Sequence, residues 1–114
     1  MSEGDFKSVM SLARIPEGKM RGCEIDGRKV VVCRTRDGVY AVDDICTHAY
    51  THLSEGRLRG TRLTCPLHGA SFDVRDGRVL GAPATQPLVT HRARINGDQI
   101  EVAVDPEAPL QITF

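Results

Sequence analysis

The hydrophobic residues of this chain fall into short runs separated by residue pairs typical of tight turns. These pairs are Asp26-Gly27, Asp37-Gly38, Gly60-Thr61, Asp76-Gly77 and Asn96-Gly97. No stretch has a sustained helical period, and only one helical turn is predicted, at residues 11–15, where Pro16 and Gly18 would end it. The pattern therefore predicts an all-β fold, an antiparallel sandwich or barrel.

The first hairpin, within residues 20–34, has a predicted register. If Asp26-Gly27 is its two-residue turn, Cys23 faces Val30 and Cys33 faces Met20. This register holds the two sulfur atoms beyond bridging distance, so we expect two free thiols that pack as small hydrophobic groups. The four residues that start at Val30 are all apolar and do not alternate, so this strand should be covered on both faces.

The last hairpin alternates well between apolar and polar residues around Asn96-Gly97. Its predicted apolar face consists of Ala93, Ile95, Ile100 and Val102. The same register places His91 on this face, opposite Val102, where we expect a buried histidine with one hydrogen bond.

Length and charge narrow the class of protein. The chain has 114 residues, which fits one domain, and 15 basic residues balance 15 acidic ones. Aromatic residues make up 4% and tryptophan is absent, so neither charge nor stacking surface favours nucleic acid. No apolar run is long enough to span a bilayer, and no leader pattern is present. We expect a soluble cytoplasmic protein.

Four residues stand out as candidate metal ligands. Cys46-x-His48 and Cys65-x-x-His68 form two short pairs, with sixteen residues between them. Thiolates and imidazoles together suit zinc or an iron–sulfur cluster, and two paired loops can enclose one centre.

This spacing resembles the signature of the Rieske family. The resemblance implies one [2Fe-2S] cluster, with Cys46 and Cys65 on one iron and His48 and His68 on the other. It also implies a single domain of Rieske fold over residues 1–114. In that fold an antiparallel β-sandwich base (1–44 and 84–114) carries an inserted cluster-binding subdomain (45–83).

The sequence departs from the high-potential members of the family at four positions. Those proteins have a disulfide between the ligand loops, but the matching residues here are Thr51 and Leu67. They also place two hydroxyl groups against the cluster, where this chain has Ala70 and Phe72, which donate no hydrogen bond. The sequence therefore predicts a low potential, near the lower end of the Rieske range of roughly −150 to +300 mV.

The ligand loops look most like those of the small ferredoxins of bacterial aromatic-ring dioxygenase systems. That resemblance implies an electron carrier, not an enzyme, between an NAD(P)H-dependent flavin reductase and a terminal oxygenase. The sequence contains no second set of iron ligands and no glycine-rich phosphate loop. We expect a monomer that docks its partners through a rim of Ala49, Leu67 and Pro83 around the exposed histidines.

Several alternatives stay open at this point. The four ligands would also suit a structural zinc, and small subunits of nitrite reductases share the fold and length. A regulatory or scaffolding role without electron turnover is a third possibility.

Other polar residues near the ligands have simpler interpretations. His52 is expected to be an exposed loop histidine. The arginines of the predicted hairpin between the ligand loops are expected to form a solvated face, although they would also suit an acidic partner. Aspartates on either side of the ligands are expected to cap turns. The residues in these two groups are Arg57, Arg59 and Arg62, and Asp43, Asp44 and Asp73.

Overall fold

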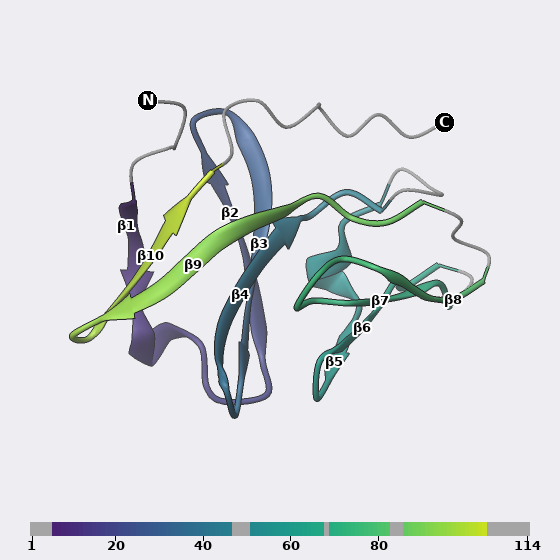
Figure 1. The fold of residues 1–114 in the computed structure, drawn as a ribbon, viewed down its shortest axis with the longest axis horizontal. Helices are drawn as coiled ribbons and strands as arrows, with labels where there is room; N and C mark the ends of the chain where they lie inside the picture. Colours follow the sequence, from purple (N-terminus) through teal and green to yellow (C-terminus); the bar gives the residue numbers. More distant parts are fainter. Residues whose placement is uncertain (1–5, 47–50, 68, 83–85, 105–114) are drawn as a thin grey trace.

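A computed structural model describes residues 6–46, 51–67, 69–82 and 86–104 of the chain. It confirms the all-β prediction (Figure 1). The strands are β1 (Lys7–Ser11), β2 (Met20–Ile25), β3 (Arg28–Thr35), β4 (Gly38–Asp43), β5 (Arg57–Arg59), β6 (Arg62–Thr64), β7 (Ser71–Asp73), β8 (Val79–Gly81), β9 (Thr90–Asn96) and β10 (Gln99–Ala103). Two short 3₁₀ turns, η1 (Leu12–Arg14) and η2 (Leu53–Glu55), are the helical elements of the described residues. None of them is long and apolar enough to cross a membrane.

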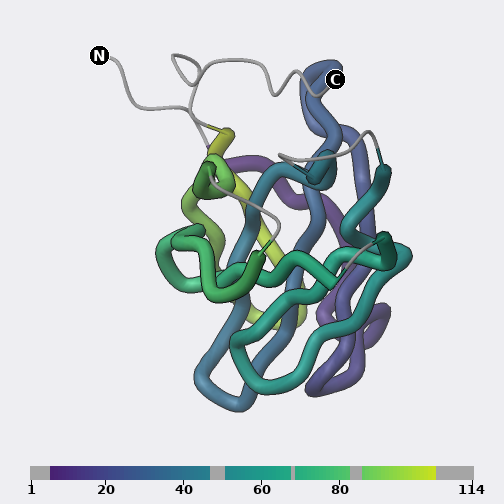
Figure 2. The backbone as a smooth tube through the Cα atoms, turned by 90° about the vertical axis from the view of Figure 1, so that its right-hand side faces the viewer, coloured from purple at the N-terminus to yellow at the C-terminus, as the bar shows by residue number. Residues whose placement is uncertain are grey.

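The strands form two antiparallel sheets. The larger sheet has the order β1-β10-β9-β4-β3-β2, and the smaller sheet has the order β5-β6-β7-β8. The chain leaves the larger sheet after β4, builds the smaller one, and returns through β9, which pairs with both β10 and β4. The smaller sheet lies beside the larger one, on the right in Figure 1 and facing the viewer in Figure 2.

The first hairpin has the predicted register. Cys23 pairs with Val30 and Cys33 with Met20. Asp26 and Gly27 have φ angles of 53° and 82°, as a type I′ turn requires at both central positions. In the described part of the chain no disulfide forms, so the prediction of two free thiols at Cys23 and Cys33 is confirmed.

The last hairpin keeps the predicted alternation of faces but has a different turn, and Ile95, predicted on the apolar face, is 42% exposed. Asn96 pairs with Gln99, so Gly97-Asp98 is the turn, and Gly97 alone takes a positive φ of 65°. A turn with glycine first is a type II′ turn, which suits the strand twist as well as Asn-Gly does. The shift moves every pair by two residues and keeps the apolar face. The predicted pairing of His91 with Val102 is therefore wrong, because Val102 pairs with Ala93. On its other side, His91 lies opposite Ala41 of β4.

A similar shift occurs between β3 and β4. Thr35 pairs with Gly38, so the turn consists of Arg36-Asp37 and not of Asp37-Gly38. The Thr35 hydroxyl accepts a hydrogen bond from the Asp37 backbone N–H at 3.1 Å, which stabilises the turn one residue earlier.

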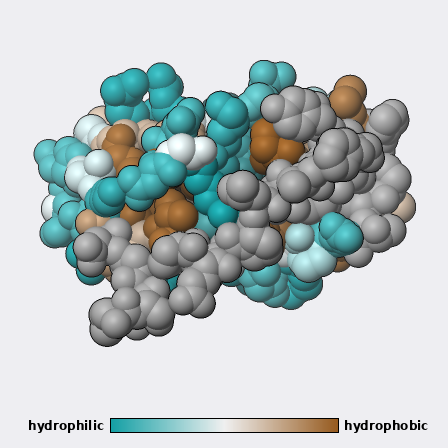
Figure 3. Space-filling view, turned by 90° about the horizontal axis from the view of Figure 1, so that it is seen from above, coloured by the Kyte–Doolittle hydropathy of each residue, from teal (hydrophilic) through white to brown (hydrophobic). Residues whose placement is uncertain are grey.

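β3 separates two hydrophobic cores. Val30 and Val32 point into the core enclosed by the larger sheet, together with Ile100 and Val102 of β10. Val31 and Cys33 point the other way, into a core shared with the smaller sheet. All four β3 residues are fully buried, as the non-alternating run predicted. On the outer surface, Figure 3 shows hydrophobic side chains in small patches between hydrophilic ones.

Candidate metal centre

Two of the four predicted ligands lie together in the core between the two sheets. Cys46 follows β4 and Cys65 follows β6, and their exposed fractions are 0% and 2%. The Cys46 N–H donates to Thr51 O at 3.0 Å, and the Cys65 N–H donates to Ala70 O at 2.7 Å, so each cysteine begins a closed loop. No disulfide joins them.

Cys65 needs a nearby positive charge to ionise at neutral pH. Burial raises its pKa to about 11; the Leu67 N–H lowers it, and the neighbouring Cys46 thiol raises it further. Without a cation the Cys65 thiol therefore stays protonated at neutral pH. A bound metal ion supplies the positive charge that stabilises both thiolates, so the donor pair fits one metal of a cluster.

The remaining predicted site residues are only partly described. His48, His68, Ala49 and Pro83 lie outside the described residues, so their roles stay predictions. Leu67, which precedes His68, is described, and 45% of its surface is exposed.

Two side chains that pack near the cysteines carry no hydrogen-bond donor. Ala70 and Phe72 are fully buried in the same core as Cys46 and Cys65. The hydroxyl of Ser71, between them in sequence, accepts a hydrogen bond from Arg62 at 2.6 Å. Ala70 and Phe72 thus give the buried cysteines apolar neighbours without a hydroxyl group, and the low potential stays a prediction.

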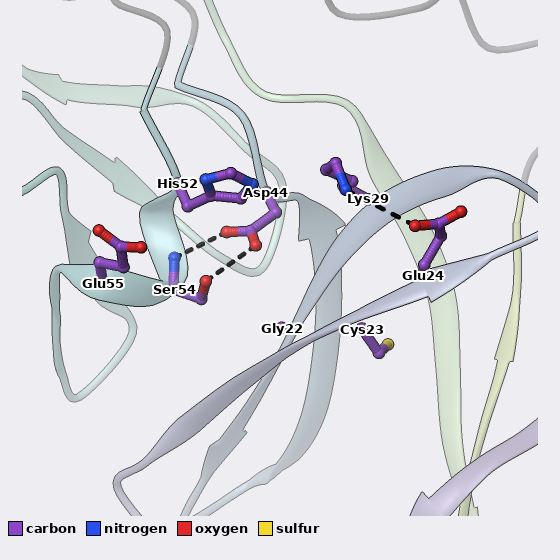
Figure 4. Close-up of a pocket in the computed structure, with 8 residues that line it drawn as sticks. All are labelled: Gly22, Cys23, Glu24, Lys29, Asp44, His52, Ser54 and Glu55. Carbon is purple, nitrogen blue, oxygen red and sulfur yellow. Dashed lines mark hydrogen bonds and ion pairs between the residues drawn. The ribbon is translucent and has the colours of Figure 1, made fainter.

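The aspartates before the first ligand have different roles. As predicted, Asp44 caps a turn: its carboxylate accepts hydrogen bonds from the N–H and hydroxyl of Ser54 (Figure 4). Burial raises the pKa of Asp44, although both bonds from Ser54 lower it. For Asp43 the prediction of a turn cap is wrong, because this residue ends β4 and its carboxylate belongs to a buried ion pair.

That ion pair joins three strands. Arg28 of β3 donates to both carboxylate oxygens of Asp43, through Nε and Nη2, at 2.8 Å each. His91 of β9 is buried, as predicted, with its Nε2 atom 2.8 Å from Asp43 Oδ1. Burial alone would raise the pKa of Asp43, but the hydrogen bonds from Arg28 and His91 outweigh it and lower the pKa.

Polar residues of the smaller sheet are arranged largely as predicted. Arg57 and Arg59 are exposed on β5, and Arg62 is exposed as well, although it also bonds Ser71. Asp73 caps its turn by accepting from the Arg75 N–H at 2.9 Å. The hydrogen bond from the Arg75 side chain contributes most to lowering the pKa of Asp73 to about 2. His52 is half-buried beside Asp44, whereas an exposed residue was expected.

The fold and the site together define a small all-β domain whose inserted sheet brings two loop thiols together for a metal. The sequence matches the model of the Rieske [2Fe-2S] domain over residues 5–101. The chain therefore belongs to this family, and its cofactor is one [2Fe-2S] cluster.

Similar proteins include ferredoxins of dioxygenase systems. The ferredoxin component of a naphthalene 1,2-dioxygenase system from Pseudomonas aeruginosa is 37% identical over 94 residues, 82% of this chain and 90% of the relative. The ferredoxin of carbazole 1,9a-dioxygenase from Nocardioides aromaticivorans IC177 has a TM-score of 0.83 at 32% identity, covering 87% and 97% of the two chains. A ferredoxin solved in complex with its oxygenase, also of carbazole 1,9a-dioxygenase, has a TM-score of 0.83 at 30% identity, covering 91% and 97%.

Proposed function

We propose that this chain is a one-electron carrier of a bacterial aromatic-ring dioxygenase system. It would take electrons from an NAD(P)H-dependent flavin reductase and pass them to a terminal oxygenase in the cytoplasm. The observation that carries the proposal is the pair of buried thiols, Cys46 and Cys65, that two loops bring together without a disulfide. The relatives named above support the same role, because they are ferredoxin components of such systems.

The proposed ligands are the four residues of the two loops. Cys46 and Cys65 would hold one iron as thiolates, and His48 and His68 would hold the other. When bound, the cluster accepts and releases one electron at a time. The chain buries the thiolates and keeps water from them through Ala70 and other residues of the shared core. Ala70 and Phe72 have no hydroxyl group to stabilise an added electron, so the potential should be low.

The proposed division of the domain follows from the sheets. The strands between Arg57 and Gly81 pair only with one another in the described part of the chain. This supports a cluster-binding subdomain at 45–83 inserted into a base of 1–44 and 84–114.

We place the docking surface for both partners at the rim of the ligand loops. Leu67 supports this placement, because its exposed apolar surface adjoins a proposed ligand. Ala49 and Pro83 would complete the rim. A small and partly apolar contact suits a monomeric carrier that must release each partner quickly.

Electron delivery to the oxygenase tests the docking proposal, with Leu67→Asp as the variant. Burying a leucine is worth about 1.5–3 kcal/mol, so the half-saturating carrier concentration should rise roughly tenfold or more. Ile95→Asp is the matched control, because Ile95 is, among the described residues, the other exposed large hydrophobic one, at 42%, and lies on β9 of the base. An equal effect of both variants, or none of Leu67→Asp, would refute the docking rim.

Iron and sulfide analysis tests the ligands. The purified protein should contain about two irons and two acid-labile sulfides per chain, and mixed ligation should lower the average g value of the reduced form. Cys65→Ser should abolish the cluster, whereas Cys23→Ser, in the outer strand β2, should retain it. A colourless protein that contains zinc would contradict the proposal.

A further inference from the structure

The first ligand loop is closed at its neck by one carboxylate, that of Asp44. Asp44 Oδ1 accepts from the Ser54 N–H at 2.7 Å, and Asp44 Oδ2 accepts from the Ser54 hydroxyl at 2.8 Å. The two residues come from opposite sides of the loop that contains Cys46. Figure 4 shows both hydrogen bonds, with His52 and Glu55 on the same side of the loop as Ser54.

We call the Asp44–Ser54 pair the clamp. Main-chain hydrogen bonds continue from the clamp toward Cys46. The Leu53 N–H donates to Asp44 O at 2.6 Å, and the Cys46 N–H donates to Thr51 O at 3.0 Å. Asp44 also donates its own N–H to Lys29 O at 3.0 Å, which fixes the clamp to β3. The neck is therefore a short ladder that joins Cys46 to the rigid base, and the Asp44–Ser54 pair forms its base-side end.

β2 lies directly against this pair. A Cβ atom on Gly22 would meet Asp44 Oδ2 at 2.8 Å and Ser54 Oγ at 3.0 Å, so a larger residue would push the clamp aside. Asp44 is 3% exposed and therefore has little access to water. The Asp44–Ser54 pair therefore needs a glycine at position 22 of β2. A substitution of Gly22 would disturb the pair without changing either of its residues.

We propose that Asp44 is the positioning residue of the first ligand loop. Its two bonds to Ser54 hold the neck closed and keep Cys46 in place, and its negative charge, two residues from Cys46, lowers the potential of the cluster. This inference rests on the proposed role of Cys46 as a ligand.

The charge and the hydrogen bonds of Asp44 have separable effects. An asparagine can still accept from the Ser54 N–H through its carbonyl, and its amide can donate to the Ser54 hydroxyl. Asp44→Asn therefore preserves the clamp and removes the charge, whereas Asp44→Ala removes both. A purely structural role would leave the potential of the Asn variant unchanged.

The test compares variants of the cluster-loaded protein by hydrogen exchange, cluster loss to a chelator, and redox titration. In Asp44→Ala the neck amides of Leu53 and Cys46 should exchange roughly tenfold faster or more. The neck should open more often, because Ser54 loses its two hydrogen bonds to the Asp44 carboxylate. Cluster loss should accelerate similarly, while amides of β3 keep their protection. Ser54→Ala and Gly22→Ala should show smaller changes of the same kind, and they test the proposal even if Asp44→Ala does not fold.

Asp44→Asn should keep exchange and cluster loss within about threefold of the parent protein and shift the potential upward. Asp76→Asn is the control, because Asp76 is an exposed aspartate of the same subdomain that also caps a turn, accepting from the Arg78 N–H at 3.1 Å. It should change none of the three measurements.

Three results would overturn the proposal: unchanged neck exchange in Asp44→Ala, equal acceleration at the neck and in β3, or an unshifted potential in Asp44→Asn. None of the measurements needs a partner protein. If the three measurements give the expected results but the protein fails to deliver electrons to the oxygenase, the carrier role is contradicted and the clamp is not.

Discussion

Replacing Arg28 by methionine should destabilise the domain strongly, because it leaves the Asp43 carboxylate buried without its main counter-charge. The Arg28 and Asp43 side chains are only 10% and 2% exposed, and two hydrogen bonds of 2.8 Å join them. Removing one partner of a buried pair costs about 3–5 kcal/mol. His91 still contacts Asp43, so we expect a value near 3 kcal/mol. For a domain of 114 residues this is a large share of a total of about 6–17 kcal/mol.

Denaturant unfolding followed by circular dichroism measures this cost, since the chain has no tryptophan for fluorescence. Lys7→Met is the control: it breaks an ion pair with Asp26 whose side chains are 53% and 58% exposed, and should cost less than about 1 kcal/mol. In a double-mutant cycle, adding Asp43→Leu to Arg28→Met should recover part of the loss. A cost below about 1 kcal/mol for Arg28→Met, or no coupling with Asp43→Leu, would refute the reasoning.

Three further predictions concern the smaller sheet and its loops. Ala70→Ser should raise the reduction potential in a redox titration, by about 60 mV if the new hydroxyl donates a bond worth about 1.4 kcal/mol to the reduced cluster. Arg75 lowers the pKa of Asp73 to about 2, below the unfolded value near 3.9. The ionised carboxylate therefore adds to the free energy of unfolding, relative to the Asp73→Asn variant, by an amount that should be constant above about pH 5 and vanish toward pH 2. Rapid pH jumps followed by circular dichroism, completed before acid dissolves the cluster, measure this difference in the free energy of unfolding. Gly56→Ala should lower the free energy of unfolding by more than about 2 kcal/mol in denaturant unfolding, because its Cβ would collide with the backbone of Thr64, next to Cys65. Gly60→Ala is the control: Gly60 has a φ of 61° and open space around it, so the cost should be about 1 kcal/mol.

Local features of the fold could be predicted from the sequence because each depends on neighbouring residues. The Asp26-Gly27 turn fixed the register of β2 and β3, since both residues adopt the positive φ that this turn needs. The turn after Asn96 was misplaced because Asn-Gly and Gly-Asp both suit a two-residue hairpin. The error kept the apolar face, because the shift of two residues equals the side-chain period of a strand.

Contacts between residues far apart in the sequence could not be predicted in this way. Arg28, Asp43 and His91 belong to three strands, and nothing around any of them indicates its partners. The clamp on the first ligand loop is similar: a cap at Asp44 was predictable, but its partner Ser54 and the close approach of Gly22 follow from how β2 lies over the loop. Cys46 and Cys65 could be singled out as candidate ligands because thiol chemistry restricts which residues can hold a metal.

The stability of the base and the geometry of the site are connected through β3. Val30 and Val32 fill the core of the larger sheet, while Val31 and Cys33 fill the core that holds both candidate thiolates. Close-packed interiors transmit strain, so a cavity on one face of β3 can shift the backbone that both faces share. Truncating Val32, on the face away from the cysteines, should therefore both lower the free energy of unfolding and speed the loss of the cluster.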